Sequence, residues 1–448
     1  MRRSHNCLLE EVRPRRIWPL VVTALVVGAY FHSMLFLDKV PNISDIRTYY
    51  YPAWTYFSHA FKSGGPPLWC SGIYCGFPLF ADSEMGVFYP VNLLFFQLPA
   101  TAGFNYSIIF HYLLGGFFAF AYCRLIRLSR PASLFVAIPF VLGGFFLSHM
   151  VHPNAVATAA WMPLFLYCLE RALAEKRLSF YALAGGVLGV QSLSGFLMLP
   201  LVEMVLALFY VIFHPSHRGE GRGSSVLRAL GGLALAAGLG AGVGMIQNLP
   251  SYNLVQNSYR AGGLSEQVSN IGSLPPAQLA GIVLPRLFGA GLAQGDYLGA
   301  WTFEETYTYI GIMPLLFAPA ALFRPRKWHA VFFLFAGVVS VLLSLGDRGR
   351  HSCSTARRAL ARRRPPDSWS PLAGGMPRTS PAASWPGCVR STRDWRPTDA
   401  CGWDAWGRAV GRGARRVAVG RSGVGRLGSR RRGSRRRPRW RCWSWTAR

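Results

Sequence analysis

The sequence predicts an all-α membrane protein, a polytopic helical bundle with about nine membrane segments and two large outer loops. Hydrophobic residues make up 51% of the 448 residues and charged residues only 15%, below the quarter that is usual in soluble domains. Apolar segments recur throughout 17–346, and most are long enough to cross a hydrocarbon core of about 30 Å as a helix. Basic residues collect in alternate connecting segments, as they do in membrane proteins of fixed orientation.

The first apolar segment, 17–37, is uncharged, too long for a signal-peptide core and without a small-residue cleavage site, which predicts an uncleaved anchor. Segments 155–169 and 199–213 are short, so they need apolar flanks, tilt or a re-entrant path. The small residues of 231–244 favour close helix packing. The nine predicted segments are 17–37, 104–123, 132–149, 155–169, 178–198, 199–213, 229–247, 307–323 and 328–346.

The basic residues of the body predict its orientation. If 1–16 is a cytoplasmic N-terminal segment and the spans alternate, the inner segments carry 17 Lys and Arg and the outer segments carry five. This predicts a multi-pass protein of the bacterial plasma membrane, with outer loops at 38–103 and 248–306. Eight of the 14 acids in 1–346 then lie outside, so we expect the protein to act at the outer face.

Residues 347–448 have a different composition. They hold 26 Arg, no Lys and five Asp, which is +21 of the total charge of +29, and eight of the 14 Trp. Such a composition is typical of GC-rich DNA read in the wrong frame, and the alternative is a disordered basic tail. We expect no packed core there, no nucleic-acid partner and, if the frame is wrong, a truncated and inactive product.

The first outer loop gathers acidic and aromatic residues. Asp45 lies eight residues beyond the first span and is followed by Tyr50 and Trp54. The aromatics fit either a belt at the membrane interface or a surface that stacks on a sugar or a prenyl chain. Asp45 is either a reacting carboxylate or only a helix cap or a solvated loop acid, and Asp82 with Glu84 forms a second acidic pair.

Further polar residues also have two interpretations each. His152, beside Pro153, is either a site residue or a capped structural histidine. Glu304 and Glu305 precede a span, where surface acids are common. Arg260 either binds a phosphate or pairs with Glu266.

Two features of other kinds remain open in the sequence. Glu203 lies just inside a membrane segment, where acids are usually functional or paired, although near the outer end it can snorkel. Cys70 and Cys75 lie in the first outer loop and form either a disulfide or two free thiols.

Four stretches carry a resemblance to a known family. They are SDIRTYYYPAW at 44–54, PLWCSGIYCGFPLFADSEMGVFYPVNLL at 67–94, HPNAVATAAWMPLFLYCLERAL at 152–173 and TFEETYTYIGIMPLL at 302–316. In this order and topology the chain resembles the YfhO-like bacterial membrane proteins. Those are similar in layout to the GT-C superfamily of polyprenyl-phosphate-sugar-dependent glycosyltransferases. The resemblance covers about 17–346, and family members continue with further membrane helices that the tail does not match.

The resemblance implies a GT-C-like fold and a membrane glycosyltransferase. It would move a sugar from a polyprenyl-phosphate donor to an envelope glycopolymer or lipid at the outer face. Asp45 is implied as the catalytic carboxylate, which takes the proton of the acceptor hydroxyl. Asp82 is implied as its partner or as a metal ligand for a possible Mg²⁺ or Mn²⁺ ion. We expect Arg260 to bind the donor phosphate, with Arg286 or Lys62 as the second candidates. The other expected substrate-binding residues are His152, Glu304, Glu305, Trp54 and Tyr50.

Two alternatives from other classes are kept. The chain is a transporter or flippase for a lipid-linked envelope precursor, or a non-catalytic assembly protein of an envelope complex. Transporters usually show intramembrane charges, broken helices and internal repeats. No phosphate-binding loop is found, so the chain carries no ATP-driven engine of its own.

Overall fold

The computed structural model describes residues 17–64, 68–70, 72–217, 221–265, 272–289, 297–299, 302–323 and 328–346. The chain divides into two compact units, 1–71 with 76–376 and 72–75 with 377–448. Of the second unit only 72–75 is described, so the fold below is that of the first. The predictions for 1–16, for the tail 347–448 and for Glu266 lie outside the described residues.

The described part is helical, with one isolated antiparallel bridge between Cys70 and Phe77 and no β-strand. Its longer helices are α2 (Trp18–Tyr30), α4 (Tyr51–Lys62), α6 (Ala100–Leu125), α7 (Arg130–Val141), α9 (Pro153–Glu175), α10 (Leu178–Leu193), α11 (Met198–Phe213), α12 (Arg222–Gln256) and α16 (Trp328–Ser344).

Short helices connect them or lie in the loops. They are α3 (His32–Phe36), η2 (Ile46–Tyr50), η3 (Leu79–Ala81), η4 (Ser83–Met85), α5 (Pro90–Phe95), α8 (Gly144–Ser148), η5 (His149–Val151), η6 (Pro215–His217), η7 (Pro276–Ile282), α14 (Phe303–Thr306), α15 (Ile312–Phe317) and η8 (Pro319–Phe323).

Four helical stretches are long and apolar enough to cross a membrane, which confirms the coarse prediction of a helical membrane protein. They are Ala100–Leu125, Arg130–Val151, Met198–His217 and Arg222–Gln256. Three shorter apolar helices, α2, α10 and α16, have 13, 16 and 17 residues. The segment predicted as short at 155–169 belongs to the 23-residue helix α9.

Two predicted spans are not continuous helices. Segment 17–37 is interrupted at Phe31, where α2 ends and α3 follows. Segment 307–323 contains only the six-residue helix α15 and the 3₁₀ helix η8. Gly311 before α15 has a φ of +96°, and Pro319 begins η8, so neither position continues an α-helix. The prediction of one span over 307–323 is therefore wrong for this structure.

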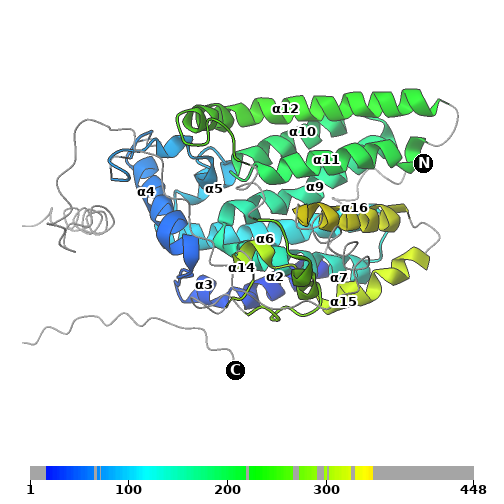
Figure 1. Ribbon diagram of the computed structural model, residues 1–448, viewed down its shortest axis with the longest axis horizontal. Helices are drawn as coiled ribbons and strands as arrows, with labels where there is room; N and C mark the ends of the chain where they lie inside the picture. Colours follow the sequence, from blue (N-terminus) through cyan, green and yellow to red (C-terminus); the bar gives the residue numbers. More distant parts are fainter. Residues whose placement is uncertain are drawn as a thin grey trace, which may run out of the picture. The chain divides into compact units, whose positions relative to one another are not determined.

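The core lies where α6, α9 and α10 pack together, with α12 against α10 (Figure 1). Helix α9 is buried along most of its length. Small residues let α10 and α12 approach closely, as the sequence predicts. A Cβ at Gly185 would lie 2.8 Å from Ala236 O, and one at Gly240 would lie 2.7 Å from Leu188 Cβ. Either change would push the two helices apart.

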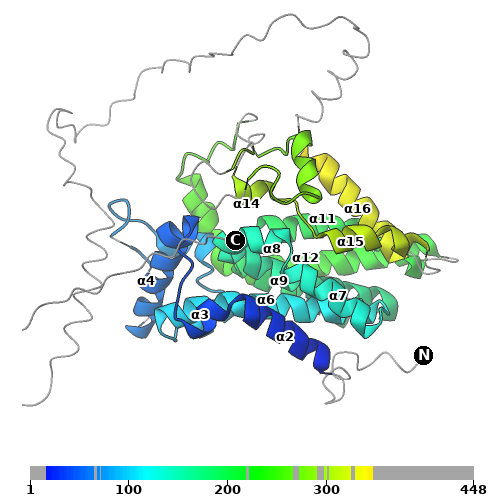
Figure 2. The same cartoon turned by 90° about the horizontal axis from the view of Figure 1, so that it is seen from below.

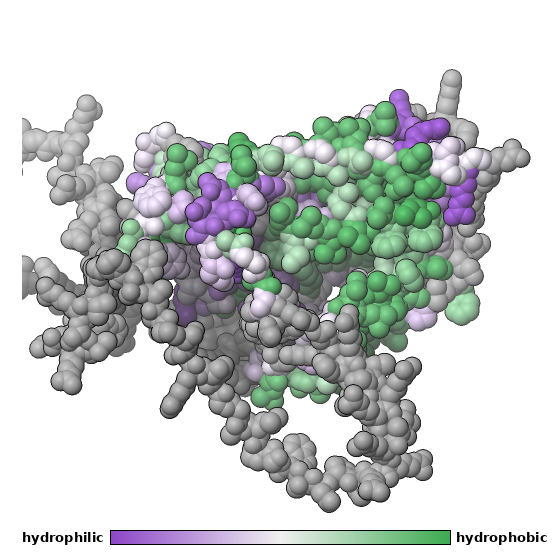
Figure 3. Space-filling model, turned by 45° about the horizontal axis from the view of Figure 1, so that its top comes forward, coloured by the Kyte–Doolittle hydropathy of each residue, from purple (hydrophilic) through white to green (hydrophobic). Residues whose placement is uncertain are grey.

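The surface of α11 and α12 is apolar. Leu201, Val202 and Val205 of α11 are more than half exposed, and α12 exposes Met245 and Ile246 in the same way. Figure 3 shows a broad hydrophobic surface on this side, with hydrophilic residues gathered toward two ends. An exposed apolar surface of this kind is typical of helices that face lipid.

The two ends of the helical bundle carry different groups of polar residues. At one end His214 and His329 meet Glu170, so the connections that follow α9, follow α11 and precede α16 lie together. At the other end α4 and α5 pack against α6, and α14 packs against η5 and α8, which precede α9 (Figure 2 shows α14 beside α8). Of the acids predicted to face outside, the structure brings Asp45, Asp82, Glu84 and Glu305 to this second end, where the candidate site is found, whereas Glu266 and Asp296 lie outside the described residues.

Candidate functional site

Asp45 makes a long-range pair with His152. Its carboxylate Oδ2 lies 3.1 Å from His152 Nε2, across 107 residues of sequence. Asp45 is the residue before η2, but its side chain makes no capping hydrogen bond there. The interpretation of Asp45 as a helix cap is therefore wrong. The side chain of Asp45 is 48% exposed and that of His152 17%, so the pair joins the surface to the interior.

The other two acids of the loop are held by consecutive tyrosines of η2. Tyr49 donates its hydroxyl proton to Asp82 Oδ2 over 2.5 Å. The Tyr50 hydroxyl lies 3.0 Å from Glu84 Oε2 and 2.9 Å from Asn154 Oδ1, so its single proton serves one of them at a time. Asp82 also caps η4 by accepting from the backbone N–H of Glu84. This end of the bundle thus brings three carboxyl groups toward His152.

The surroundings change the acidity of this cluster. Burial raises the pKa of Asp82 above its ordinary value, against the hydrogen bond from Tyr49, which lowers it. Glu84 is exposed, yet desolvation by the protein around its carboxyl, followed by the charge of Asp82, still raises its pKa. Burial first, and then these acids, raise the pKa of Tyr49 and of Tyr50. Both phenols therefore act as neutral donors.

The fourth stretch of the resemblance reaches the same end. Ser148 donates its hydroxyl to the backbone oxygen of Glu304, which ties α14 to α8. One side-chain atom that could bind a metal ion, from each of His149, His152 and Glu305, lies within 4.8 Å of the other two. Residues of all four stretches therefore gather at one end of the bundle, although their spacing in sequence exceeds 250 residues. Glu304 contributes its backbone, and Glu305 its side chain.

Two predicted site residues have other surroundings. Trp54 is 4% exposed and packs between Phe96 and Phe104, at ring distances of 4.5 and 5.6 Å. Its ring therefore contributes to packing. The prediction that Trp54 binds a sugar at the surface does not fit this position. Arg260 follows α12, is exposed and contacts its neighbour Tyr259 through Nε and through the ring face. In the described part no contact connects Arg260 to the acids.

The two second candidates for binding the donor phosphate, Lys62 and Arg286, also make other contacts. Lys62 donates to the backbone oxygen of Leu98 over 2.6 Å. Arg286 lies near Tyr307, and its charge opposes the rise that burial causes in the pKa of that phenol. Neither contact involves the carboxyl cluster.

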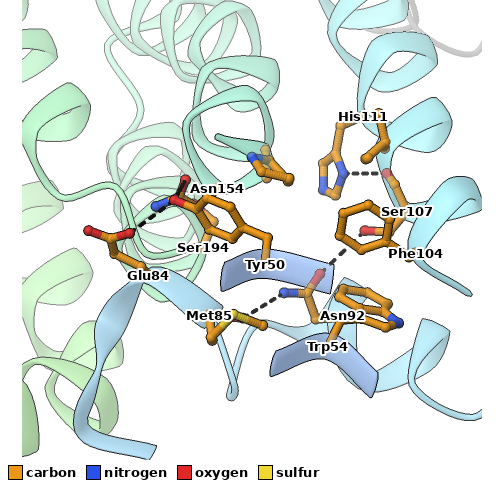
Figure 4. Close-up of a pocket in the computed structure, with 13 residues that line it drawn as sticks. Tyr50, Trp54, Glu84, Met85, Asn92, Phe104, Ser107, His111, Asn154 and Ser194 are labelled. Carbon is orange, nitrogen blue, oxygen red and sulfur yellow. Dashed lines mark hydrogen bonds between the residues drawn. The ribbon is translucent and has the colours of Figure 1, made fainter. Parts of the chain in front are cut away.

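A small cavity lies beneath Tyr50 and Glu84. Figure 4 shows Tyr50 beside Glu84 and Asn154, with Phe104 and His111 on the opposite side. The cavity holds about 30 Å³, enough for one or two water molecules and too small for a sugar.

Several buried polar residues near the cavity were missed. His111 Nε2 lies 2.7 Å from the hydroxyl of Tyr89, which also accepts from Trp161 Nε1. Asn154 is 5% exposed, and its Nδ2 has no partner. A polar residue inside an apolar segment, as at His111, is the sequence signal that would have found part of this network.

Glu203 and the loop cysteines answer the two questions left open. Glu203 is 1% exposed and accepts a 2.8 Å hydrogen bond from Gln191 Nε2, so it is paired and does not snorkel. Its Oε1 has no partner. Cys70 and Cys75 are both free thiols in the structure.

The chain matches no protein-family model, no curated protein and no solved structure. The family resemblance and the GT-C-like fold therefore stay predictions. What the structure itself shows is a helical protein with four apolar helical stretches long enough to cross a membrane in its described part, and a cluster of carboxyl, phenol and imidazole groups at one end.

Proposed function

We propose that the chain is a membrane glycosyltransferase with a GT-C-like fold. It moves a sugar from a polyprenyl-phosphate donor to an envelope glycopolymer or lipid at the outer face of the bacterial plasma membrane. The site at the end of the bundle that holds Asp45 performs the transfer. Membrane lipid surrounds the apolar helices and supplies the prenyl chain of the donor.

The observation that carries the proposal is the pair of Asp45 and His152 beside Asp82 and Glu84. A carboxylate that is half exposed and held by an imidazole can meet a substrate while keeping a fixed orientation. The apolar surface of α11 and α12 supports the proposal, because a site at the end of helices that face lipid would be within reach of the phosphate of a lipid-linked donor. A prenyl chain and a polar acceptor can reach such a site together.

The chemistry needs one proton transfer. The acceptor hydroxyl attacks the anomeric carbon of the donor, and the bond from that carbon to the phosphate oxygen breaks. The polyprenyl phosphate leaves with the bonding electrons, and Asp45 takes the proton of the attacking hydroxyl. His152 donates a hydrogen bond to Asp45 and so holds its carboxylate, while Asp82 and Glu84 shape the charge of the surface around it.

The test uses the full chain reconstituted in proteoliposomes, with radiolabelled polyprenyl-phosphate hexoses and pentoses as donors and envelope glycan fragments as acceptors. Asp45→Asn is expected to lower the transfer rate by about 10²- to 10⁴-fold, the usual contribution of a general base. Asp38→Asn is the matched control, since Asp38 is an exposed acid of the same loop and Asn tolerates its φ of +49°.

Transfer by Asp45→Asn at the rate of Asp38→Asn would remove Asp45 from the mechanism. No transfer by the wild-type chain with any donor of the panel would count against the proposal as a whole.

One observation favours the alternative of a transporter or flippase. Glu203 is a carboxyl buried inside the bundle with one oxygen unpaired, and such groups often belong to transport pathways. The same proteoliposomes distinguish the two functions. Movement of a labelled lipid between leaflets with its sugar intact, lost in Glu203→Gln and kept in Asp45→Asn, would favour transport over transfer.

A further inference from the structure

We propose that His149, His152 and Glu305 bind a divalent transition metal ion of the zinc type. The first observation is their arrangement. His149 is the first residue of the 3₁₀ helix η5 (His149–Val151), and His152 is the residue that follows it. The backbone N–H of His152 donates to the backbone oxygen of His149 over 2.9 Å, so the two residues lie one 3₁₀ turn apart. Their ring centroids are 5.9 Å apart.

The hydrogen bonds of each imidazole leave one nitrogen for a metal. His149 Nδ1 lies 3.1 Å from the backbone oxygen of Phe145, which makes Nδ1 the protonated atom and leaves the lone pair on Nε2. His152 Nε2 donates to Asp45, which leaves the lone pair on Nδ1. That Nδ1 is buried and has no hydrogen-bond partner among the residues that the structure describes. A buried polar atom without a partner indicates a missing ligand.

Asp45 fits this site as an outer-sphere residue. Histidines that bind metals usually donate their second ring N–H to a carboxylate or a carbonyl, which fixes the ring and its tautomer. Here Asp45 does this for His152 and the carbonyl of Phe145 does it for His149. Both rings are thus positioned by contacts that need no metal.

Glu305 completes the set. It comes from α14, and one donor atom from each of the three residues lies within 4.8 Å of the others. Ligands of one tetrahedral ion lie about 3.3 Å apart at usual zinc–ligand distances, so a small movement closes the site. Glu305 is exposed and can make that movement, whereas the buried ring of His149 cannot.

The donor set selects the type of ion. Two imidazoles and one carboxylate suit zinc and similar ions, whereas Mg²⁺ and Mn²⁺ prefer oxygen ligands. The expected Mg²⁺ or Mn²⁺ therefore fits these three residues less well than zinc. Three protein ligands leave a fourth position of a tetrahedral ion open, which is typical of zinc sites that bind a further ligand. The inference does not depend on the proposed sugar transfer.

The experiment measures the binding of zinc, with no other ligand, to the full chain. The chain is purified with an affinity tag that contains no histidine. The protein is stripped with a chelator, titrated with zinc chloride and examined by elemental analysis after dialysis. One zinc ion per chain is expected for the wild type. His152→Ala and Glu305→Gln are expected to weaken binding by at least about 100-fold and about 10-fold, and Asp45→Asn by about 10- to 100-fold.

Matched controls keep the test sharp. Glu304→Gln alters the neighbouring acid, and His59→Ala removes an exposed histidine of α4, so both are expected to bind zinc as the wild type does. His214→Ala tests the histidines at the opposite end of the bundle and is expected to bind zinc normally.

Less than stoichiometric binding by the wild type, wild-type binding by both His152→Ala and Glu305→Gln, or loss of binding in His214→Ala would overturn the inference. Glu305 is exposed, so Glu305→Gln is expected to fold even if His152→Ala does not. Zinc binding without sugar transfer would leave the site standing and remove only the proposed function.

Discussion

The two ends of the bundle each contain a histidine that faces an acid, but they differ in how completely the groups are satisfied. His214 Nε2 lies 3.1 Å from Glu170 Oε2, and its Nδ1 lies 2.8 Å from the hydroxyl of Ser216. His152 Nε2 makes the same contact with Asp45, whereas its Nδ1 has no partner. Both ring nitrogens of His214 therefore have a hydrogen-bond partner in the described part, whereas only one ring nitrogen of His152 has one.

The acids differ in the same direction. Glu170 Oε2 also accepts from the hydroxyl of Tyr210 over 2.5 Å and approaches His329 Nε2 at 3.5 Å. Its side chain is 13% exposed, against 48% for Asp45. A saturated and buried cluster stabilises the fold, whereas an incomplete and accessible one can still bind something. This difference is the reason that we propose the end with Asp45 as the functional one.

The largest effect that would sharpen this comparison is on folding. Glu170→Ala would leave His214 Nε2 without its acceptor and Tyr210 with only the hydroxyl of Tyr122, which is expected to cost about 3 kcal/mol of unfolding free energy. Asp45→Ala is expected to cost less than about 1 kcal/mol because its pair is half exposed. Equilibrium unfolding in mixed micelles measures both. Equal losses would break the comparison.

Removing one phenol tests the acid cluster itself. Tyr49→Phe deletes the hydrogen bond to Asp82 and is expected to lower stability by about 1 to 2 kcal/mol, since hydrogen bonds to charged groups contribute about that much. Tyr56→Phe is the control, because Tyr56 lies on the adjacent helix and donates to the backbone oxygen of Trp69 at the surface, away from the acids. A smaller loss for Tyr49→Phe than for Tyr56→Phe would argue against a specific role for the bond.

The pH dependence follows from the raised pKa values of Asp82 and Glu84. In the folded protein both groups hold their protons to a higher pH than in the unfolded chain. Their contribution to stability is therefore fully present below about pH 4 and is lost as pH rises through the raised pKa values. If their ionised forms support transfer, the rate is expected to rise with pH over that same interval, above the usual carboxyl range.

Tyr49→Phe sharpens the pH prediction. The hydrogen bond from Tyr49 lowers the pKa of Asp82, so its removal is expected to move the acidic limb of the rate profile to higher pH. The transfer rate measured from pH 4 to pH 8 in both proteins checks the direction. A shift to lower pH, or an unchanged limb near pH 4, would contradict it.

The smallest expected effect concerns Glu203, which belongs to neither end. Glu203 Oε1 and Gln191 Oε1 both lack partners, so Glu203→Gln supplies an amide donor without adding volume. Stability is expected to stay the same or to rise by up to about 1 kcal/mol, because a neutral amide is cheaper to bury than a carboxylate. Thermal unfolding in detergent checks it. A loss of more than about 1 kcal/mol would show that the fold needs the acid.

The sequence was sufficient for the local features. Apolar composition and length located helices α6, α11 and α12, and the small residues of 231–244 predicted a close helix contact, which α12 makes with α10. It also placed Asp45 and Asp82 in a loop beside the membrane helices. It failed at 307–323, where an apolar stretch is broken by Gly311 and Pro319, because hydrophobicity alone does not specify a continuous helix.

Only the tertiary structure decided which side chains meet. The pair of Asp45 with His152, the bond of Tyr49 to Asp82 and the approach of Glu305 to two histidines join segments that are far apart in the chain. It also showed that Trp54 is packed inside and that Glu203 is paired. Composition and periodicity report how each segment meets lipid or core, whereas these contacts depend on how whole helices pack against one another.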